Sequence, residues 1–244
     1  QNYTLTRPKD GCTIMALTES HLYTMARGKS NMKINDLVGV ARAMEEPTFV
    51  VVNAKNKELS TVKKMIKRAQ KKPISVAIAS IGGTEHIGMY SYSKAANIPF
   101  KAVSFGSGAQ SLQALASGKV EASLLNPSEA AALIADKKIK AIVLLHDKAL
   151  ADYPKVKTSY SMGHKVKVVT TRGYAVLKGT PQSVIDEISK GMVKAMKHET
   201  FGNYLKGASL DPATSPAGTK VWDKQLKENY KKAAAALKGL GLTK

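Results

Sequence analysis

The stretch Val76-Ala77-Ile78-Ala79-Ser80-Ile81-Gly82-Gly83-Thr84-Glu85-His86 decides the fold of this chain. Its apolar first half predicts a short β-strand, and a helical pattern begins directly after the two glycines. Because glycine has no Cβ, the turn at Gly82 and Gly83 can approach a ligand closely. The helix that starts near Thr84 directs its unpaired N–H groups and the positive end of its dipole toward that turn. Such an end favours a carboxylate or a phosphate.

Two further units of the same design follow in the chain. Residues 100–105 predict a strand, Gly106-Ser107-Gly108 a turn, and the next residues a helix that ends at Gly118. Residues 120–125 predict another strand, after which Asn126 is a good N-cap and Pro127 a good first helical residue. Strands that alternate with helices in this way predict an α/β protein with mostly parallel sheets.

The remaining segments predict how the chain divides. Strands are expected at 12–17, 36–41, 49–53, 141–145, 166–171 and 174–177, and helices begin near residues 61 and 180, with a last helix around Trp222. The β-branched run 49–53 is typical of a parallel strand that is covered on both faces. We expect residues 71–172 to form one lobe and residues 1–70 with 173–244 to form the other, with crossings near Lys72-Pro73 and Arg172-Gly173.

Composition leaves several partners open. The 244 residues carry a net charge of +20, which allows nucleic acid, an anionic surface or an anionic small molecule as a partner. The lysines are spread over many segments, and four Phe and one Trp supply few stacking platforms for bases, so a solvated basic surface is the simpler interpretation. The single cysteine, Cys12, excludes disulfides within the chain and CxxC sites.

Leader and membrane segments are not expected in this sequence. No apolar run approaches the roughly 18 residues that a membrane span needs. No stretch resembles a signal peptide, so the sequence is expected to be a mature form or one that is cut at its start.

The sequence lacks the motifs that carry catalysis. The five histidines form no HExxH pattern, no GxSxG or Walker motif is present, and Gly106–Ser111 departs from the dinucleotide fingerprint because Ser111 stands at the third glycine. We therefore expect no enzyme activity, no metal and no cofactor. What remains is a set of small and uncharged polar residues at strand ends, where open α/β sheets bind ligands. The candidate ligand-binding residues are Ser80, Gly82, Gly83, Thr84, Ser104, Gly106, Ser107, Gly108 and Asn126; the alternative is that they only form caps and turns.

The order of these segments is similar to a known family. Seven segments match its motifs in sequence order: Pro8–Thr13, Asp36–Ala41, Ala79–Ile87, Val103–Ser107, Leu115–Glu121, Tyr153–Thr158 and Gly179–Pro181. On these residues the chain resembles the solute-binding proteins of tripartite tricarboxylate transporters, the TctC or Bug family. Ser104 and Ser107 replace the Pro and Lys of the family's VPYKG segment, Ser80 replaces a glycine, and Gly39 replaces a proline.

The resemblance implies a fold, a ligand class and partners. It implies a two-lobe, type II periplasmic binding-protein fold that captures a small carboxylate, such as a di- or tricarboxylate, an aromatic acid or an amino acid. It further implies a periplasmic monomer that serves membrane transporter subunits and binds no nucleic acid. The family's first strand, glycine-rich ligand loop and helix have no counterpart in the sequence, so the lobe that contains residues 1–70 is expected to be incomplete. The alternatives are an α/β enzyme that acts on an anionic small molecule and a basic nucleic-acid-binding protein.

Overall fold

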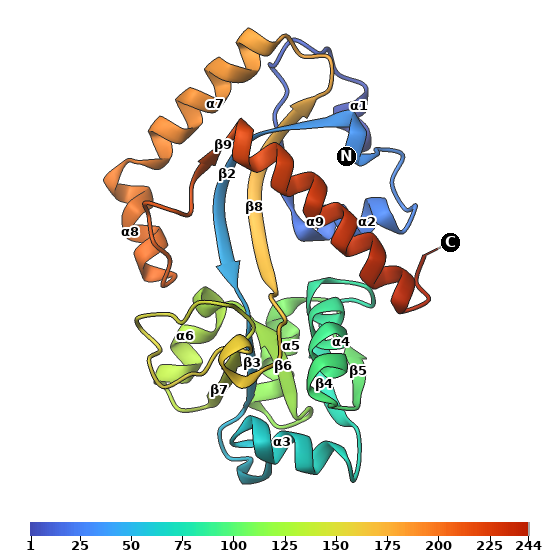
Figure 1. The fold of residues 1–244 in the computed structure, drawn as a ribbon, viewed down its shortest axis with the longest axis vertical. Helices are drawn as coiled ribbons and strands as arrows, with labels where there is room; N and C mark the ends of the chain where they lie inside the picture. Colours follow the sequence, from blue (N-terminus) through green and yellow to red (C-terminus); the bar gives the residue numbers. More distant parts are fainter. Residues whose placement is uncertain (244) are drawn as a thin grey trace. The chain divides into compact units, whose positions relative to one another are not determined.

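A computed structural model describes residues 1–243 and divides the chain into two compact α/β units (Figure 1). Unit 1 contains residues 1–45 and the chain from residue 170 onward, and unit 2 is Glu46–Val169. The predicted α/β class is confirmed. Among residues 1–243, every helix is too short or too polar to cross a bilayer.

Unit 1 is a four-stranded sheet between helices. Its strands follow the order β1-β8-β2-β9, with β1 (Met15–Thr18), β8 (Val169–Leu177), β2 (Leu37–Pro47) and β9 (Ala217–Gly218). Strand β1 is antiparallel to β8, and β9 is antiparallel to β2. Helices α2 (Glu19–Ala26) and α9 (Thr219–Gly239) pack on one face through Leu22, Trp222 and Leu226, and α7 (Gln182–Met196) covers the other face through Ile185. The short helices α1 (Asn2–Leu5), η1 (Ile34–Asp36) and α8 (Glu199–Gly207) complete the unit.

Strand β8 is continuous where the sequence predicts two strands. Gly173, at its middle, lies so close to its neighbours that a Cβ would be 2.7 Å from both the Ala41 carbonyl oxygen and Cε2 of Trp222. The glycine is therefore a packing requirement and does not interrupt the strand.

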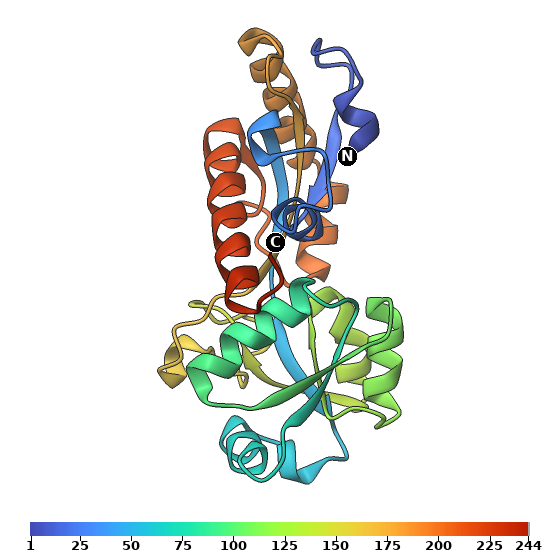
Figure 2. The ribbon, with the colours of Figure 1, turned by 90° about the vertical axis from the view of Figure 1, so that its right-hand side faces the viewer.

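Unit 2 is a five-stranded sheet with two helices on each face (Figures 1 and 2). Its strands follow the order β5-β4-β6-β3-β7, with β5 (Phe100–Ser104), β4 (Ile74–Ile78), β6 (Ala122–Leu125), β3 (Phe49–Asn53) and β7 (Ile139–Leu144). Helices α3 (Val62–Ala69) and α4 (Thr84–Ala96) share one core cluster with Val50, Val76 and Ile78. Helices α5 (Gly108–Ala116) and α6 (Pro127–Ala135) cover the opposite face over Val51 and Ala77. Two 3-10 turns, η2 (Lys57–Leu59) and η3 (Tyr160–Met162), lie in its loops.

The direction of β3 differs from the prediction of a parallel strand, which is wrong at this point. Strand β4 is parallel to β5 and β6, whereas β3 is antiparallel to both β6 and β7. All four residues Phe49–Val52 are fully buried. Burial on both faces therefore explains the continuous apolar run, and it does not require parallel neighbours.

The boundary between the units also differs from the expected one. Residues 46–70, expected with the N-terminal segment, belong to unit 2, and the chain passes between units at 45–46 and 169–170. The reason is β3: it lies between β6 and β7 in the unit 2 sheet and brings η2 and α3 with it.

Candidate functional site

The predicted site residues all lie in unit 2, at one edge of its sheet. Strands β5, β4 and β6 are adjacent, and β4 is parallel to both neighbours, so their carboxyl ends at Ser104, Ile78 and Leu125 share that edge. Two hydrogen bonds join the first two turns: Ser104 Oγ donates to the Ala79 carbonyl oxygen (3.2 Å), and the Phe105 N–H donates to the Ile78 carbonyl oxygen (3.0 Å). The three predicted strand–turn–helix units are thus neighbours in space.

The first turn is held by its own contacts. Gly82 has a φ of +72°, and its N–H donates to Nδ1 of the buried His86 (3.0 Å). The Gly83 N–H donates to the Ser80 carbonyl oxygen (3.1 Å), and a Cβ on Gly83 would be 2.7 Å from Ser80 Oγ. Both glycines are therefore needed by the turn itself, and His86 has a structural role. Ser80 is exposed, and Thr84 opens helix α4.

The second turn leaves its helix end more open. Gly106 has a φ of +81°, and Ser107 caps α5 by accepting a hydrogen bond from the Gln110 N–H at 3.2 Å. No acidic residue lies in the first turn of α5. A Cβ on Gly108 would meet only Oε1 of Glu129 within 4 Å, at 4.0 Å, so side-chain space exists at this helix start.

The third turn is already occupied by the chain's own groups. Asn126 is buried, and its Nδ2 donates to the Pro47 carbonyl oxygen (2.9 Å) and the Glu46 carbonyl oxygen (3.3 Å). Carboxylates satisfy the start of α6: Glu129 Oε2 accepts from the Asn126 N–H and Glu46 Oε1 accepts from the Ser128 N–H, each at 3.0 Å. Asn126 therefore ties α6 to the end of β2, just before β3 begins, and its side chain is committed to that contact.

A further carboxylate, Glu85, lies in the first turn of α4. Burial raises the pKa of the Glu85 carboxyl and the nearby Glu129 raises it further, whereas hydrogen bonds with the N–H groups of Glu85 and Ala79 oppose the rise. Of the three helix starts, α6 is closed by two acids, α4 carries one acid, and α5 has no acid in its own first turn, although Oε1 of Glu129 lies near Gly108. The start of α5 is therefore the one least closed by acids, and Glu129 opposes an anion there.

Sequence reasoning missed Glu46 and Glu129 as members of this edge. The role of Glu129 could have been predicted from the sequence, because Asn126 and Glu129 stand at the spacing of a capping box. Glu46 carried no such signal, since it reaches Ser128 from a segment 82 residues away in the sequence. No cluster of His, Cys, Asp and Glu side chains within residues 1–243 has the composition of a metal site.

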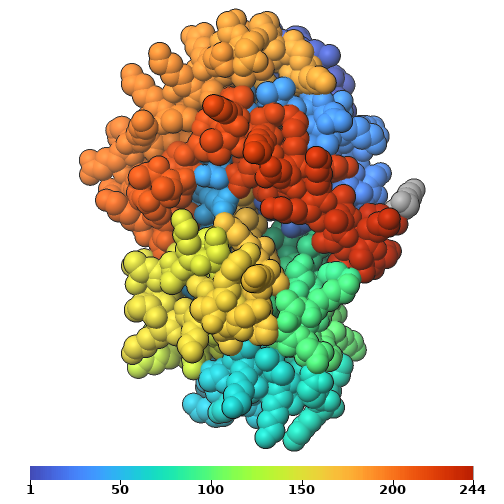
Figure 3. Space-filling view, in the orientation of Figure 1, coloured from blue at the N-terminus to red at the C-terminus, as the bar shows by residue number. Residues whose placement is uncertain are grey.

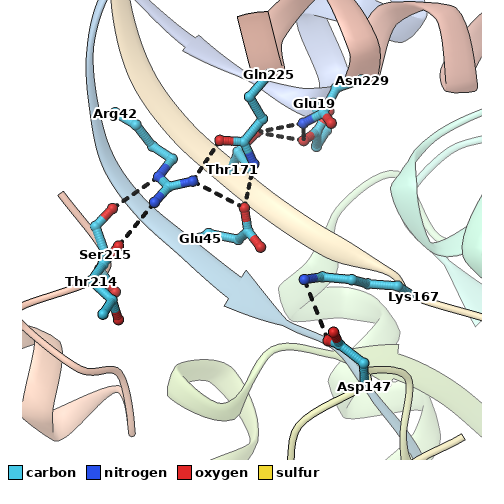
Figure 4. Close-up of polar contacts among 10 residues, drawn as sticks. All are labelled: Glu19, Arg42, Glu45, Asp147, Lys167, Thr171, Thr214, Ser215, Gln225 and Asn229. Carbon is cyan, nitrogen blue, oxygen red and sulfur yellow. Dashed lines mark hydrogen bonds and ion pairs between the residues drawn. The ribbon is translucent and has the colours of Figure 1, made fainter. Parts of the chain in front are cut away.

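Unit 1 contains a buried polar network that sequence reasoning also missed (Figure 4). Glu19 is 4% exposed and accepts hydrogen bonds from the Thr171 hydroxyl and from Nδ2 of Asn229 (2.9 Å). Beside it, Gln225 donates to Glu45, and Arg42 bridges Glu45 (3.2 Å) and Gln225 (2.5 Å). Burial raises the pKa of Glu19 to about 7, against the effect of these hydrogen bonds, and lowers the pKa of Arg42.

Comparisons with known proteins agree on one family. The family described as "Tripartite tricarboxylate transporter family receptor" (TctC) matches residues 3–242. Similar solved structures include a TctC solute-binding protein from Polaromonas (18% identity, TM-score 0.82, covering 97% of this chain and 81% of that one). An R. palustris protein solved with adipate has 16% identity and a TM-score of 0.83, covering 98% of this chain and 81% of that one. MatC from Rhodopseudomonas palustris, solved with malate, has 17% identity and a TM-score of 0.81, covering 96% and 82%. No curated protein sequence matches the chain.

Proposed function

The chain belongs to the TctC family of tripartite tricarboxylate transporter receptors, and we propose that it captures a small carboxylate in the periplasm for delivery to membrane subunits of such a transporter. Adipate and malate, the ligands in two similar structures, are dicarboxylates, so this class is the first to test. Receptor function also accounts for a site that consists of glycine turns, helix starts and hydroxyl groups.

The observation that carries this proposal is the shared edge of β5, β4 and β6, from which both α4 and α5 begin. We place a ligand carboxylate against the start of α5, which offers backbone N–H groups and the hydroxyl group of its N-cap Ser107. The hydroxyl group of Thr84, at the start of α4, lies at the same edge of the sheet. Hydrogen bonds to a charged group contribute roughly 1.5–3 kcal/mol each, so two or three outweigh a diffuse surface charge that salt screens. Gly82, Gly83 and Gly106 shape the turns, and Ser80 and Ser104 lie on their exposed side.

The test is a thermal-shift and calorimetric screen of mono-, di- and tricarboxylates. A true ligand at about 100 times its Kd stabilises the folded chain by about 2.7 kcal/mol. The deciding variant is Gly108→Val, which fills space at the start of α5 where the neighbouring contacts tolerate a side chain. We expect it to lower carboxylate affinity at least tenfold, whereas Gly191→Val, at an equally open helical glycine, leaves affinity unchanged.

A lysine clamp is the competing explanation, and Lys71→Gln with Lys72→Gln tests it. If these changes abolish binding while Gly108→Val retains it, the ligand is not held at the start of α5. If no carboxylate binds the unmodified chain, the proposed ligand class is wrong.

A further inference from the structure

One surface of unit 2 concentrates much of the chain's positive charge. Eleven basic side chains and two acidic ones lie in residues 55–72 and 136–140. We call this surface the α3 basic face; its basic members are Lys55, Lys57, Lys63, Lys64, Lys67, Arg68, Lys71, Lys72, Lys137, Lys138 and Lys140. All ten lysines are exposed. The lysines are thus less evenly spread than the sequence suggests.

Hydrogen bonds show that the two segments form one continuous surface. Lys140 Nζ donates to the Ser60 carbonyl oxygen (2.9 Å), and Lys64 Nζ donates to the Lys57 carbonyl oxygen (3.1 Å). The Ala54 N–H donates to the Lys138 carbonyl oxygen (3.0 Å). Strand β7 and helix α3 therefore present their lysines on neighbouring segments. The segment that contains α3 is drawn in cyan at the lower end of unit 2 in Figure 3.

The acidic residues of this face are already paired. Glu58 lies 3.5 Å from Arg68, and Asp136 lies 3.5 Å from Lys138. Arg68 also binds Glu121 at 2.6 Å, so the one guanidinium is engaged within the unit. The charge available to a partner is consequently that of flexible lysine ammonium groups.

The chemistry of the face selects among anionic partners. Residues 54–73 and 136–140 contain no aromatic side chain, so bases have nothing to stack on. The available cations are lysines, which act as point charges and lack the bidentate fork of arginine. The apolar side of α3, with Val62, Met65 and Ala69, is buried in the core of unit 2 and cannot insert into lipid. A cluster of lysines on an amphipathic helix suits a diffuse surface of phosphate groups.

We propose that the α3 basic face docks the protein electrostatically on an anionic phospholipid membrane. Helix α3 leads through residues 70–73 into the amino end of β4, whereas the candidate ligand site lies at the carboxyl end of β4. Within unit 2 the membrane contact and the ligand site are therefore at opposite sheet edges. A membrane bound at the α3 basic face therefore does not cover the turns that follow β4 and β5.

The test is co-sedimentation of the full chain with vesicles of phosphatidylcholine, with and without about 30% phosphatidylglycerol, as salt rises from about 0.05 M to 0.3 M. We expect binding to the anionic vesicles alone, and its loss as salt rises. Each lysine near an anionic membrane is worth about fivefold in partitioning, so the variant Lys63→Gln/Lys64→Gln/Lys67→Gln/Lys71→Gln should bind at least 100-fold more weakly.

The matched control removes the same charge from unit 1: Lys190→Gln/Lys194→Gln/Lys197→Gln/Lys220→Gln, four exposed lysines along α7 and at the start of α9. It should bind within tenfold of the unmodified chain. No binding to anionic vesicles at low salt overturns the proposal, and equal losses in both variants would assign binding to net charge instead. Tight binding to duplex DNA at about 0.15 M salt, lost with the α3 lysines, would make the face a nucleic-acid surface and also overturn the proposal.

Discussion

Replacing Glu19 by glutamine should remove a large pH dependence from the stability of unit 1. The Glu19 carboxyl is 4% exposed, and burial raises its pKa from 4.5 to about 7. A carboxyl whose pKa is higher in the folded state does not lower the free energy of unfolding well below pH 4.5, where it is protonated in both the folded and the unfolded state. As pH rises from 4.5 to 7, the unfolded chain loses the proton first, so the free energy of unfolding falls; above pH 7 the loss is constant.

The size of the effect follows from the shift in pKa. At 1.36 kcal/mol for each unit, the full loss is about 3 kcal/mol, and about 2.5 kcal/mol of it falls between pH 5 and pH 8. A glutamine side chain at this position would keep the shape of the protonated acid and could still accept hydrogen bonds from Thr171 and Asn229. The Glu19→Gln variant should therefore gain stability relative to the unmodified chain as pH rises.

The assay is urea unfolding at pH 5, 6, 7 and 8, followed by tryptophan fluorescence. Trp222 is the only tryptophan of the chain and is buried in unit 1, so its signal reports that unit. Glu228→Gln, at a second acid of unit 1, on the same helix as Asn229, controls for the lost charge. If the difference between Glu19→Gln and the unmodified chain is the same at all four pH values, Glu19 is ionised throughout. Its hydrogen bonds and its position in the first turn of α2 would then outweigh burial.

Two further predictions concern packing and ligand affinity. Gly173→Ala should destabilise unit 1 by about 1–3 kcal/mol in the same fluorescence assay, because its Cβ would lie 2.7 Å from the Ala41 carbonyl oxygen and from the Trp222 ring. A loss below about 0.5 kcal/mol would show that the strand relaxes to accept the methyl group. Glu85→Gln should raise the affinity for a dicarboxylate about tenfold at pH 8, where it removes a negative charge. The affinity of the unmodified chain should fall as pH rises and Glu85 loses its proton, and the variant should show a flatter pH profile. Calorimetry that finds equal affinities at pH 8 would place Glu85 away from the ligand.

Local signals in the sequence predicted the elements that surround the candidate site. Thr61 and Ser107 cap their helices through side-chain oxygens, Pro127 opens α6, and Gly118 takes the left-handed conformation with a φ of +80°. Each of these features depends on residues within a few positions of one another. The three strand–turn–helix units could therefore be read in order, together with the edge at which they meet.

Features set by distant residues could not be predicted in this way. An apolar run such as 49–53 indicates a buried strand, but its direction depends on pairing with β6 and β7, about 75 and 90 residues away. Helix α2 and the two-residue strand β9 were not predicted, and Asn126 proved to be tied to the end of β2. The raised pKa of Glu19 likewise comes from burial in the folded unit, which the hydrogen bonds with Thr171 and Asn229 oppose only in part.

The two edges of the unit 2 sheet carry opposite chemistry, and this separates two sources of anion binding. The edge with the candidate site contains Glu46, Glu85 and Glu129, so an anion there depends on backbone N–H groups at the start of α5, whose own first turn has no acid. The α3 basic face carries most of its charge on exposed lysines, whose attraction is long-ranged and screened by salt. Carboxylate capture should accordingly persist at about 0.3 M salt, whereas membrane docking should not. The net charge of +20 therefore describes the surface of the protein and does not identify its ligand.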